Sequence, residues 1–194
     1  MTKKIQDIIT ESISVKSKVL NDTILLKTVE KIVDGIVAAL QKGNHLYFCG
    51  NGGSAADAQH LAAEFSGRFY LDRDALPAEA LHCNTSYLTA VANDYSYEVV
   101  YSRLLKGLGH EGDILVGLST SGNSGNIVKA FETAREKKIT TIGFTGEGGG
   151  KMAPLSDYLV SIPSKNTPRI QEAHMLLGHI ICQLVEEKYF TPIP

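Results

Sequence analysis

Apolar residues recur along this chain at two different spacings, and each spacing predicts a different kind of element. Within residues 1–43 they return every three or four positions, which is the repeat of one face of a helix. Ile5, Ile9 and Ile13 mark the first of these stripes, and a denser stripe runs over residues 24–40. We therefore expect two helices at the amino-terminal end, which pack either on the rest of the chain or on another subunit.

From residue 45 onward, short continuous apolar runs alternate with helical stretches. Continuous apolar runs are typical of strands that are covered on both faces. The expected strands lie at 45–49, 78–83, 113–118, 139–144 and 158–162, and the last helix runs from Pro168 to about Tyr189. Strands that alternate with helices in this way predict a parallel sheet between two helical layers. The expected fold class is therefore α/β, with one domain over residues 1–194 and residues 1–43 as a helical extension.

The charge and the cysteines of the chain argue against several classes of function. The 194 residues carry a formal net charge of −2, which does not suit a surface for nucleic acid or for an acidic membrane. Cys49, Cys83 and Cys182 form no CxxC pair and are expected to be reduced thiols. We find neither a signal-peptide pattern nor an apolar run of the roughly 20 residues that a membrane span needs, so we expect a cytoplasmic protein.

Two loops that follow expected strands carry residues suited to an anion. In parallel α/β sheets, ligands bind beyond the carboxyl ends of the strands. The first loop is Gly50-Asn51-Gly52-Gly53-Ser54, where glycines let the backbone approach an anion closely and Ser54 can cap the next helix. The second is Ser119-Thr120-Ser121-Gly122-Asn123-Ser124, whose four hydroxyls suit a phosphate without a Lys or Arg. The alternative for each loop is an ordinary turn that caps a helix.

Acidic and imidazole side chains fall on the helix after the first loop and on the last helix. His60 and Glu64 are four residues apart, which places them on one helix face. Gln171 and His179 are displaced from each other by roughly 80° around the last helix, so they can converge on one site. A carboxylate and an imidazole suit general acid–base chemistry. The alternative is an exposed polar face, and His174, on another side of the last helix, is expected to be structural or interfacial.

Taken together, the stretches CGNGGSAADAQHLAAEFSGRF, GLSTSGNS, FTGEGGGKMA and RIQEAHMLLGHI, with Ala92-Asn93-Asp94, resemble the SIS (sugar isomerase) family. Within that family they are most similar to the sedoheptulose 7-phosphate isomerases, over residues 20–187. The resemblance implies a three-layer α/β/α sandwich around a five-stranded parallel sheet. It also implies conversion of D-sedoheptulose 7-phosphate to D-glycero-D-manno-heptose 7-phosphate, the first step of bacterial ADP- or GDP-heptose synthesis. The expected assembly is a homotetramer whose neighbouring subunits complete each site.

The resemblance also assigns roles to single residues. The counterparts of Glu64 and His179 are the catalytic pair, and those of His60, Glu64, Gln171 and His179 hold one zinc ion per subunit, which accepts such ligands. The expected substrate contacts are Asn51, Gly52, Gly53, Ser54, Glu64, Asn93, Asp94, Ser119, Thr120, Ser121, Ser124 and Gln171. A carboxylate held by zinc is a weaker base, so either the ligands exchange as substrate binds or the metal chiefly polarises the sugar oxygens. No nucleotide cofactor is expected.

Two alternatives to this isomerase stay open at the level of the sequence. One is a non-catalytic SIS-domain protein that binds the bacterial replication initiator, although that protein lacks the acid and the late histidine that stand here as Glu64 and His179. The other is an isomerase of a different phosphosugar, such as a hexulose or arabinose phosphate. Some relatives carry an acid where this chain has Pro168, so no role for that acid is expected here. Arg68 and Arg169 either add charge to the site or form surface ion pairs.

Overall fold

Five parallel strands form the centre of the structure. The computed structural model describes residues 1–190. The strands are arranged in the order β2-β1-β3-β4-β5, and each neighbouring pair is parallel. Their bounds are β1 Leu46–Gly50, β2 Ala78–Ala80, β3 Ile114–Ser119, β4 Thr140–Thr145 and β5 Tyr158–Ser161. This arrangement confirms the predicted parallel sheet.

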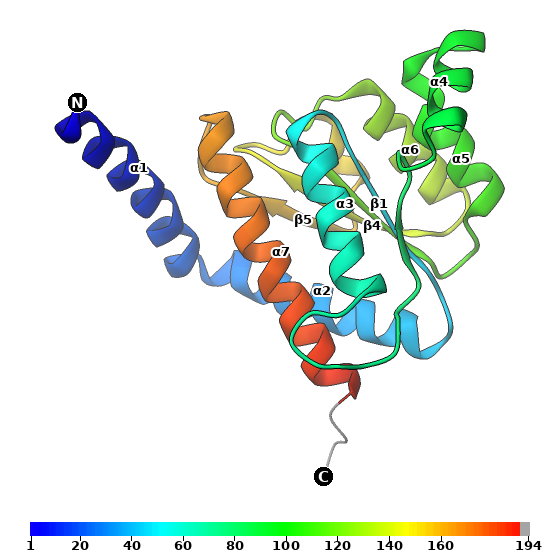
Figure 1. The fold of residues 1–194 in the computed structure, drawn as a ribbon, viewed down its shortest axis with the longest axis horizontal. Helices are drawn as coiled ribbons and strands as arrows, with labels where there is room; N and C mark the ends of the chain where they lie inside the picture. Colours follow the sequence, from blue (N-terminus) through cyan, green and yellow to red (C-terminus); the bar gives the residue numbers. More distant parts are fainter. Residues whose placement is uncertain (191–194) are drawn as a thin grey trace.

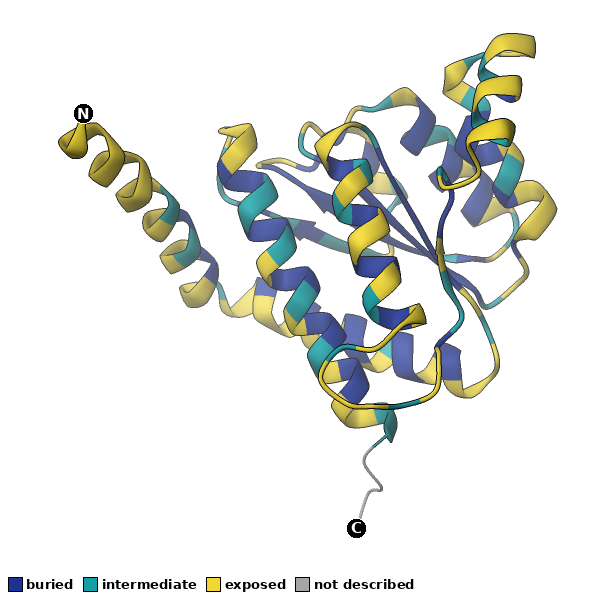
Figure 2. Cartoon of the chain, in the orientation of Figure 1, coloured by how far each residue is buried: buried dark blue, intermediate teal, exposed yellow. Residues whose placement is uncertain are grey.

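Helices cover both faces of this sheet (Figure 1). Leu46 and Phe48 point into one apolar cluster with α2, α3 and α7, whereas Tyr47 and Cys49 point into a second cluster with α5 and α6. Figure 2 shows the strands as a buried layer between the two sets of helices. The helix bounds are α1 Thr2–Asn21, α2 Thr23–Gln41, α3 Gly53–Ser66, α4 Thr85–Asp94, α5 Val100–Leu108, α6 Gly125–Glu136 and α7 Thr167–Phe190. The predicted three-layer sandwich is therefore confirmed.

The order of the strands places two loops side by side. The chain leaves β1 for β2 on one side, and later returns to β3 on the other side of β1. Gly50 at the end of β1 is paired with Leu118 near the end of β3. The loops that follow β1 and β3 thus stand at the point where the strand order reverses, which is where ligands bind in sheets of this type. These are the two loops that the sequence selected.

α1 projects from the body of the protein (Figure 1) and is attached to it from Ile8 to its carboxyl end. Val15 and Val19 of this helix are buried. The guanidinium of Arg169 on α7 is also buried and donates to a carbonyl of α1 at 3.1 Å, and Ser12 donates to Glu172 on α7 at 2.6 Å. Arg169 therefore serves the attachment of α1. The exposed apolar side chains along α1 are Ile5, Ile8, Ile9 and Ile13.

The structure differs from the expected elements in a few places. The second strand was expected over residues 78–83 but ends at Ala80. A 3-10 turn, η1 Tyr97–Val99, precedes α5, and a second such turn, η2 Gly150–Leu155, follows β4. α2 is part of the main core, so within residues 1–43 α1 alone projects as an extension. None of the helices in residues 1–190 combines the length and apolar composition that a membrane crossing requires.

Candidate active site

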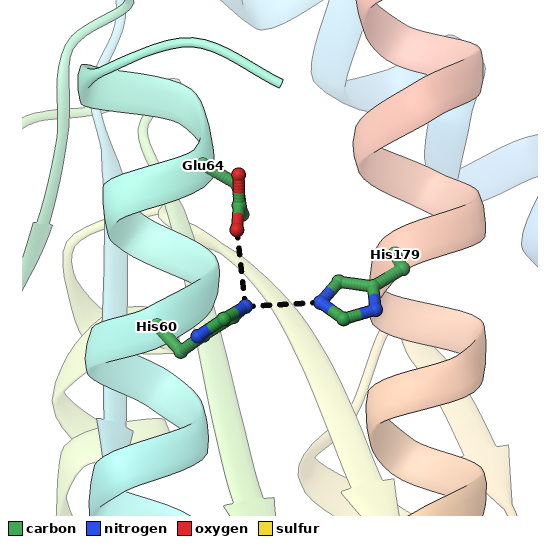
Figure 3. A group of neighbouring side chains, drawn as sticks. All are labelled: His60, Glu64 and His179. Atoms are coloured by element: carbon green, nitrogen blue, oxygen red, sulfur yellow. Dashed lines mark hydrogen bonds and ion pairs between the residues drawn. The ribbon is translucent and has the colours of Figure 1, made fainter. Parts of the chain in front are cut away.

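Two neighbouring helices bring His60, Glu64 and His179 together (Figure 3). Nε2 of His60 lies 3.0 Å from Nε2 of His179 and 3.0 Å from Oε1 of Glu64. One ligand atom from each residue lies within 4.8 Å of the other two. His60 and Glu64 come from one face of α3 and His179 comes from α7, so the group exists only in the folded chain. The structure thus unites the two residues that were predicted to be the catalytic pair.

Glycines allow α3 and α7 to approach closely. A Cβ atom on Gly178 would lie 2.7 Å from both methyl carbons of Leu61, and one on Gly53 would lie 2.7 Å from the side-chain nitrogen of Gln171. The two contacts follow the same order along both helices, which therefore run parallel (Figure 1). Because the backbones are this close at Leu61 and Gly178, the next residue on α7, His179, reaches the residue before Leu61 on α3.

The donor atoms of the group suit a divalent metal ion. Nε2 of His60 carries one proton at most in its neutral form, so it cannot donate linear hydrogen bonds to both Glu64 and His179. A cation between the three would accept an electron pair from each. Zinc binds imidazole nitrogen and carboxylate oxygen at about 2.0–2.2 Å, which places its ligand atoms roughly 3.3 Å apart, close to the 3.0 Å between Nε2 of His60 and each of its two neighbours. The side chain of His60 is 51% exposed, so such an ion would keep open positions.

Gln171, the fourth predicted metal ligand, lies two turns before His179 on α7. Its amide nitrogen is directed at Gly53, the first residue of α3. Gly53 and His60 are seven residues apart, a rise of roughly 10 Å along the helix. The group of three therefore forms without Gln171, which instead lies beside the loop that follows β1. A metal-ligand role for Gln171 stays a prediction, and its position suits its other predicted role, contact with the substrate.

His174 lies inside the core rather than with His179. Its side chain is fully buried, and Nε2 donates to the carbonyl oxygen of Thr145 at 3.0 Å. The other ring nitrogen, Nδ1, has no hydrogen-bond partner among residues 1–190. Burial lowers the pKa of His174 from 6.5 to about 4, so this side chain is neutral at pH 7. Its position agrees with the structural role that was considered for it.

Asp57 lies one turn before His60 and was not selected from the sequence. One of its carboxylate oxygens, Oδ2, is buried and has no hydrogen-bond partner in the described part of the chain. Burial raises the pKa of Asp57, and the nearby His60 opposes this shift. A second acidic side chain thus stands behind the group of three.

The loop after β1 is held by side chains from other elements. Asn51 and Asn126 exchange two amide hydrogen bonds, both of 2.9 Å, and the hydroxyl of Tyr97 donates to Oδ1 of Asn51 at 3.1 Å. Gly52 has a φ of +55°, which residues with a side chain rarely adopt, and it caps the start of α3. Ser54, in the first turn of α3, is buried. Sequence reasoning missed Asn126 and Tyr97, because no local pattern reveals that they meet Asn51.

The loop after β3 gathers hydroxyl groups at the start of α6. Oγ of Ser119 lies 2.9 Å from Oγ of Ser124 and 3.4 Å from Oγ of Ser121. The free N–H groups of the first turn of α6 add donors to the same region. The loop packs closely on a second glycine stretch, since a Cβ atom on Gly122 would lie 2.1 Å from the carbonyl oxygen of Gly149. Thr120 also accepts a backbone hydrogen bond from that stretch, at Gly146, of 3.0 Å.

Asn93 and Asp94, two further predicted substrate contacts, are the last residues of α4. Both are exposed, and the amide of Asn93 donates to the carboxylate of Asp94 at 2.9 Å. The turn η1 begins three residues after Asp94 and carries Tyr97, which reaches the loop after β1. The two residues thus stand close in sequence to an element that contacts Asn51, and their contact with substrate stays a prediction.

Comparison with known proteins identifies the family of this chain. The family description "SIS domain" matches residues 10–146. Phosphoheptose isomerase of Aneurinibacillus thermoaerophilus is 53% identical over 190 residues, which cover 98% of this chain and 96% of the relative. Phosphoheptose isomerase of Mycobacterium tuberculosis is 48% identical over 187 residues, covering 96% and 95%. The solved structures of phosphoheptose isomerases from Neisseria gonorrhoeae and Francisella tularensis match with TM-scores of 0.89 and 0.92 at 39% and 32% identity, and each match covers 96% of this chain and 98% of the other. The chain therefore belongs to the SIS domain family.

Proposed function

We propose that this chain is an aldose–ketose isomerase that converts D-sedoheptulose 7-phosphate to D-glycero-D-manno-heptose 7-phosphate. The relatives named phosphoheptose isomerase support this activity, because they match nearly the whole chain at about half identity. The observation that carries the proposal is the meeting of Glu64 and His179 between α3 and α7. The alternative of a non-catalytic initiator-binding protein is not favoured, since that protein lacks the acid and the late histidine.

The reaction moves one proton between carbons and one between oxygens. The Glu64 carboxylate takes a proton from C1 of the ketose and returns it to C2, with an enediol or enediolate in between. The imidazole of His179 carries a proton from the hydroxyl at C1 to the oxygen at C2, so that the ketone becomes a hydroxyl and C1 becomes an aldehyde. The two steps together conserve all atoms and need no redox cofactor. The hydroxyl-rich loop after β3 holds the terminal phosphate through hydroxyl and N–H donors.

A bound zinc ion and a homotetrameric assembly form part of the same proposal. A zinc ion bound by His60, Glu64 and His179, with or without Gln171, would supply a Lewis acid that polarises the sugar oxygens. A homotetramer is supported by apolar side chains that are exposed beside the group of three, namely Leu176 and Ile180 on α7, and along α1. A cytoplasmic location stays a prediction from the sequence.

The proposal is tested by turnover of sedoheptulose 7-phosphate with zinc present. We expect conversion by the wild type, and a loss of about 100-fold or more in kcat for Glu64→Gln and for His179→Gln. Glu187→Gln and His110→Gln make the same chemical changes at exposed positions away from the group and should keep wild-type rates. A wild-type protein that binds zinc but produces no aldose from this ketose would disprove the proposed activity.

A further inference from the structure

The loop that follows α3 is fastened to α7 by a buried ion pair. Nε of Arg73 donates to Oε1 of Glu186 at 2.8 Å, and the two side chains are 4% and 2% exposed. Three successive backbone N–H groups, those of residues 69–71, also donate to this carboxylate, at 3.1, 2.7 and 2.9 Å. Consecutive N–H groups directed at one point form a binding site for an anion, and here the protein itself supplies the anion. The carboxylate of Glu186 therefore fixes the path of the whole loop.

The guanidinium of Arg73 holds the carboxyl end of α3. Its terminal nitrogens donate to the carbonyl oxygens of Glu64 and Phe65, both at 2.8 Å, and of Gly67 at 3.1 Å and Asp74 at 2.9 Å. The last carbonyls of a helix have no partner within the helix, and a cation there is favourable. One of these carbonyls belongs to Glu64, a member of the predicted catalytic pair. Arg73 thus forms a direct hydrogen bond to the backbone of that residue.

The same loop reaches the predicted catalytic histidine. The ring of Phe69 lies 5.8 Å from the imidazole of His179, measured between centroids, at an interplanar angle of 35°. The backbone N–H of Phe69 is one of the three that Glu186 holds. The position of the ring against His179 is therefore set by the same carboxylate that pairs with Arg73.

We propose that Arg73 and Glu186 are positioning residues that hold Glu64 and His179 in the relative position that proton transfer needs. Phe69 connects this pair to His179, because its backbone is held by Glu186 and its ring lies against the imidazole. The inference rests on the proposed isomerase function. A buried ion pair is weak evidence for stability alone, because apolar residues of similar size often serve as well. What an apolar pair could not do is hold the Glu64 carbonyl and the backbone N–H of Phe69 at once.

Steady-state kinetics of Arg73→Lys, Glu186→Gln and Phe69→Leu test this role. Lysine keeps the charge at position 73 but cannot reproduce the planar fork that reaches several carbonyls. Since a displacement of about 1 Å at reacting groups can cost about 100-fold, we expect kcat to fall roughly 10- to 100-fold in Arg73→Lys and Glu186→Gln. KM should change less than about 3-fold, because the loop after β3 is not touched by this pair.

The matched control is Asp113→Asn. Asp113 is also a buried carboxylate, and it accepts backbone hydrogen bonds from His45 at 2.8 Å and His110 at 2.7 Å, before the amino ends of β1 and β3. This variant should lower the melting temperature but leave kcat near the wild-type value. Equal losses of kcat in Asp113→Asn and Glu186→Gln would mean that the buried carboxylates act through stability alone, and would overturn the inference.

A second readout separates this inference from the proposed function. The Cε1–H signal of His179 in metal-free, isotope-labelled protein, assigned with His179→Gln, should shift in Arg73→Lys and Glu186→Gln but not in Asp113→Asn. An unchanged signal overturns the inference whatever the rates are. A wild type without isomerase activity would refute the proposed function, and the shift of this signal would still decide whether the pair positions His179. If Glu186→Gln does not fold, Arg73→Lys and the kcat of Phe69→Leu decide in its place.

Discussion

Replacing Gly178 by alanine should force α3 and α7 apart at the candidate site. The new Cβ atom would lie 2.7 Å from both methyl carbons of Leu61, which is 2% exposed, so either this side chain or the two helices must shift. Overpacking of this kind costs about 1–3 kcal/mol. Alanine in a helix interior is more favourable than glycine by about 1 kcal/mol. The net loss in the free energy of unfolding should therefore be about 0–2 kcal/mol, while the geometry of the site changes more than the stability does.

Shortening Leu61 should relieve the clash and so identify its cause. Leu61→Ala alone should cost about 2–5 kcal/mol, because it leaves a cavity. In the double variant that carries Gly178→Ala and Leu61→Ala, the methyl group of the new alanine at position 178 fills part of that cavity. The loss in the free energy of unfolding should then be smaller than the sum of the two single losses by about 1 kcal/mol or more. Urea unfolding of the metal-free proteins at one protein concentration measures these values.

Metal binding gives the more sensitive assay of the same change. His60 and His179 flank Leu61 and Gly178, so Gly178→Ala should reduce zinc affinity by about 10- to 100-fold, as changes next to metal ligands do. Gly107→Ala on α5 is the matched control, since its new Cβ atom would meet nothing within 4 Å. If Gly178→Ala matched Gly107→Ala in both stability and zinc affinity, the close approach of the two helices could not be what forms the site.

Four further outcomes are expected. Burial lowers the pKa of His174 to about 4, so between pH 6.5 and 4 only the unfolded state binds a proton at this side chain, and His174 should contribute a loss of about 3 kcal/mol of wild-type stability as the pH falls through that window in chemical unfolding. In His174→Gln this part of the pH dependence should be absent. Zinc should raise the melting temperature of the wild type but not of His60→Ala, by differential scanning fluorimetry. Asn126→Ala should raise KM about 10-fold by releasing Asn51, with a smaller effect on kcat. Removal of residues 1–20 should lower the number of subunits per particle, which is the mass measured by light scattering divided by the mass of the shortened chain, and an unchanged number of subunits would count against assembly through α1.

The sheet could be predicted from the sequence because its signal is local. The interior of β3, residues 114–118, is a continuous apolar run, and such runs are expected where helices cover both faces. The i, i+4 spacing of His60 and Glu64 likewise fixed their common face on any helix. Each of these features depends only on residues that lie within a few positions of one another in the sequence. No knowledge of tertiary contacts was therefore needed to predict them.

Other parts of the site depend on contacts that no local pattern encodes. The offset between α3 and α7 follows from where Gly178 meets Leu61, and a shift of one turn would have paired His179 with a different neighbour. The alignment of the helices set by this contact also leaves Gln171 apart from the group of three. The eight-residue spacing between Gln171 and His179 could not reveal this by itself. Asn126 was missed because its partner, Asn51, is distant in the sequence. Side chains whose role is to hold others leave no pattern of their own.

The attachment of α1 has a consequence for assembly. The buried Arg169 and the bond from Ser12 to Glu172 fix the direction of this helix within a single chain, before any second copy is present. In the proposed assembly, the apolar side chains of α1 would therefore already be held in place before subunits meet, and little conformational entropy would be lost on docking through this apolar arm. Association through this arm should resemble the fitting of preformed surfaces rather than coupled folding, and the heat-capacity change on assembly should match the area of the contact alone.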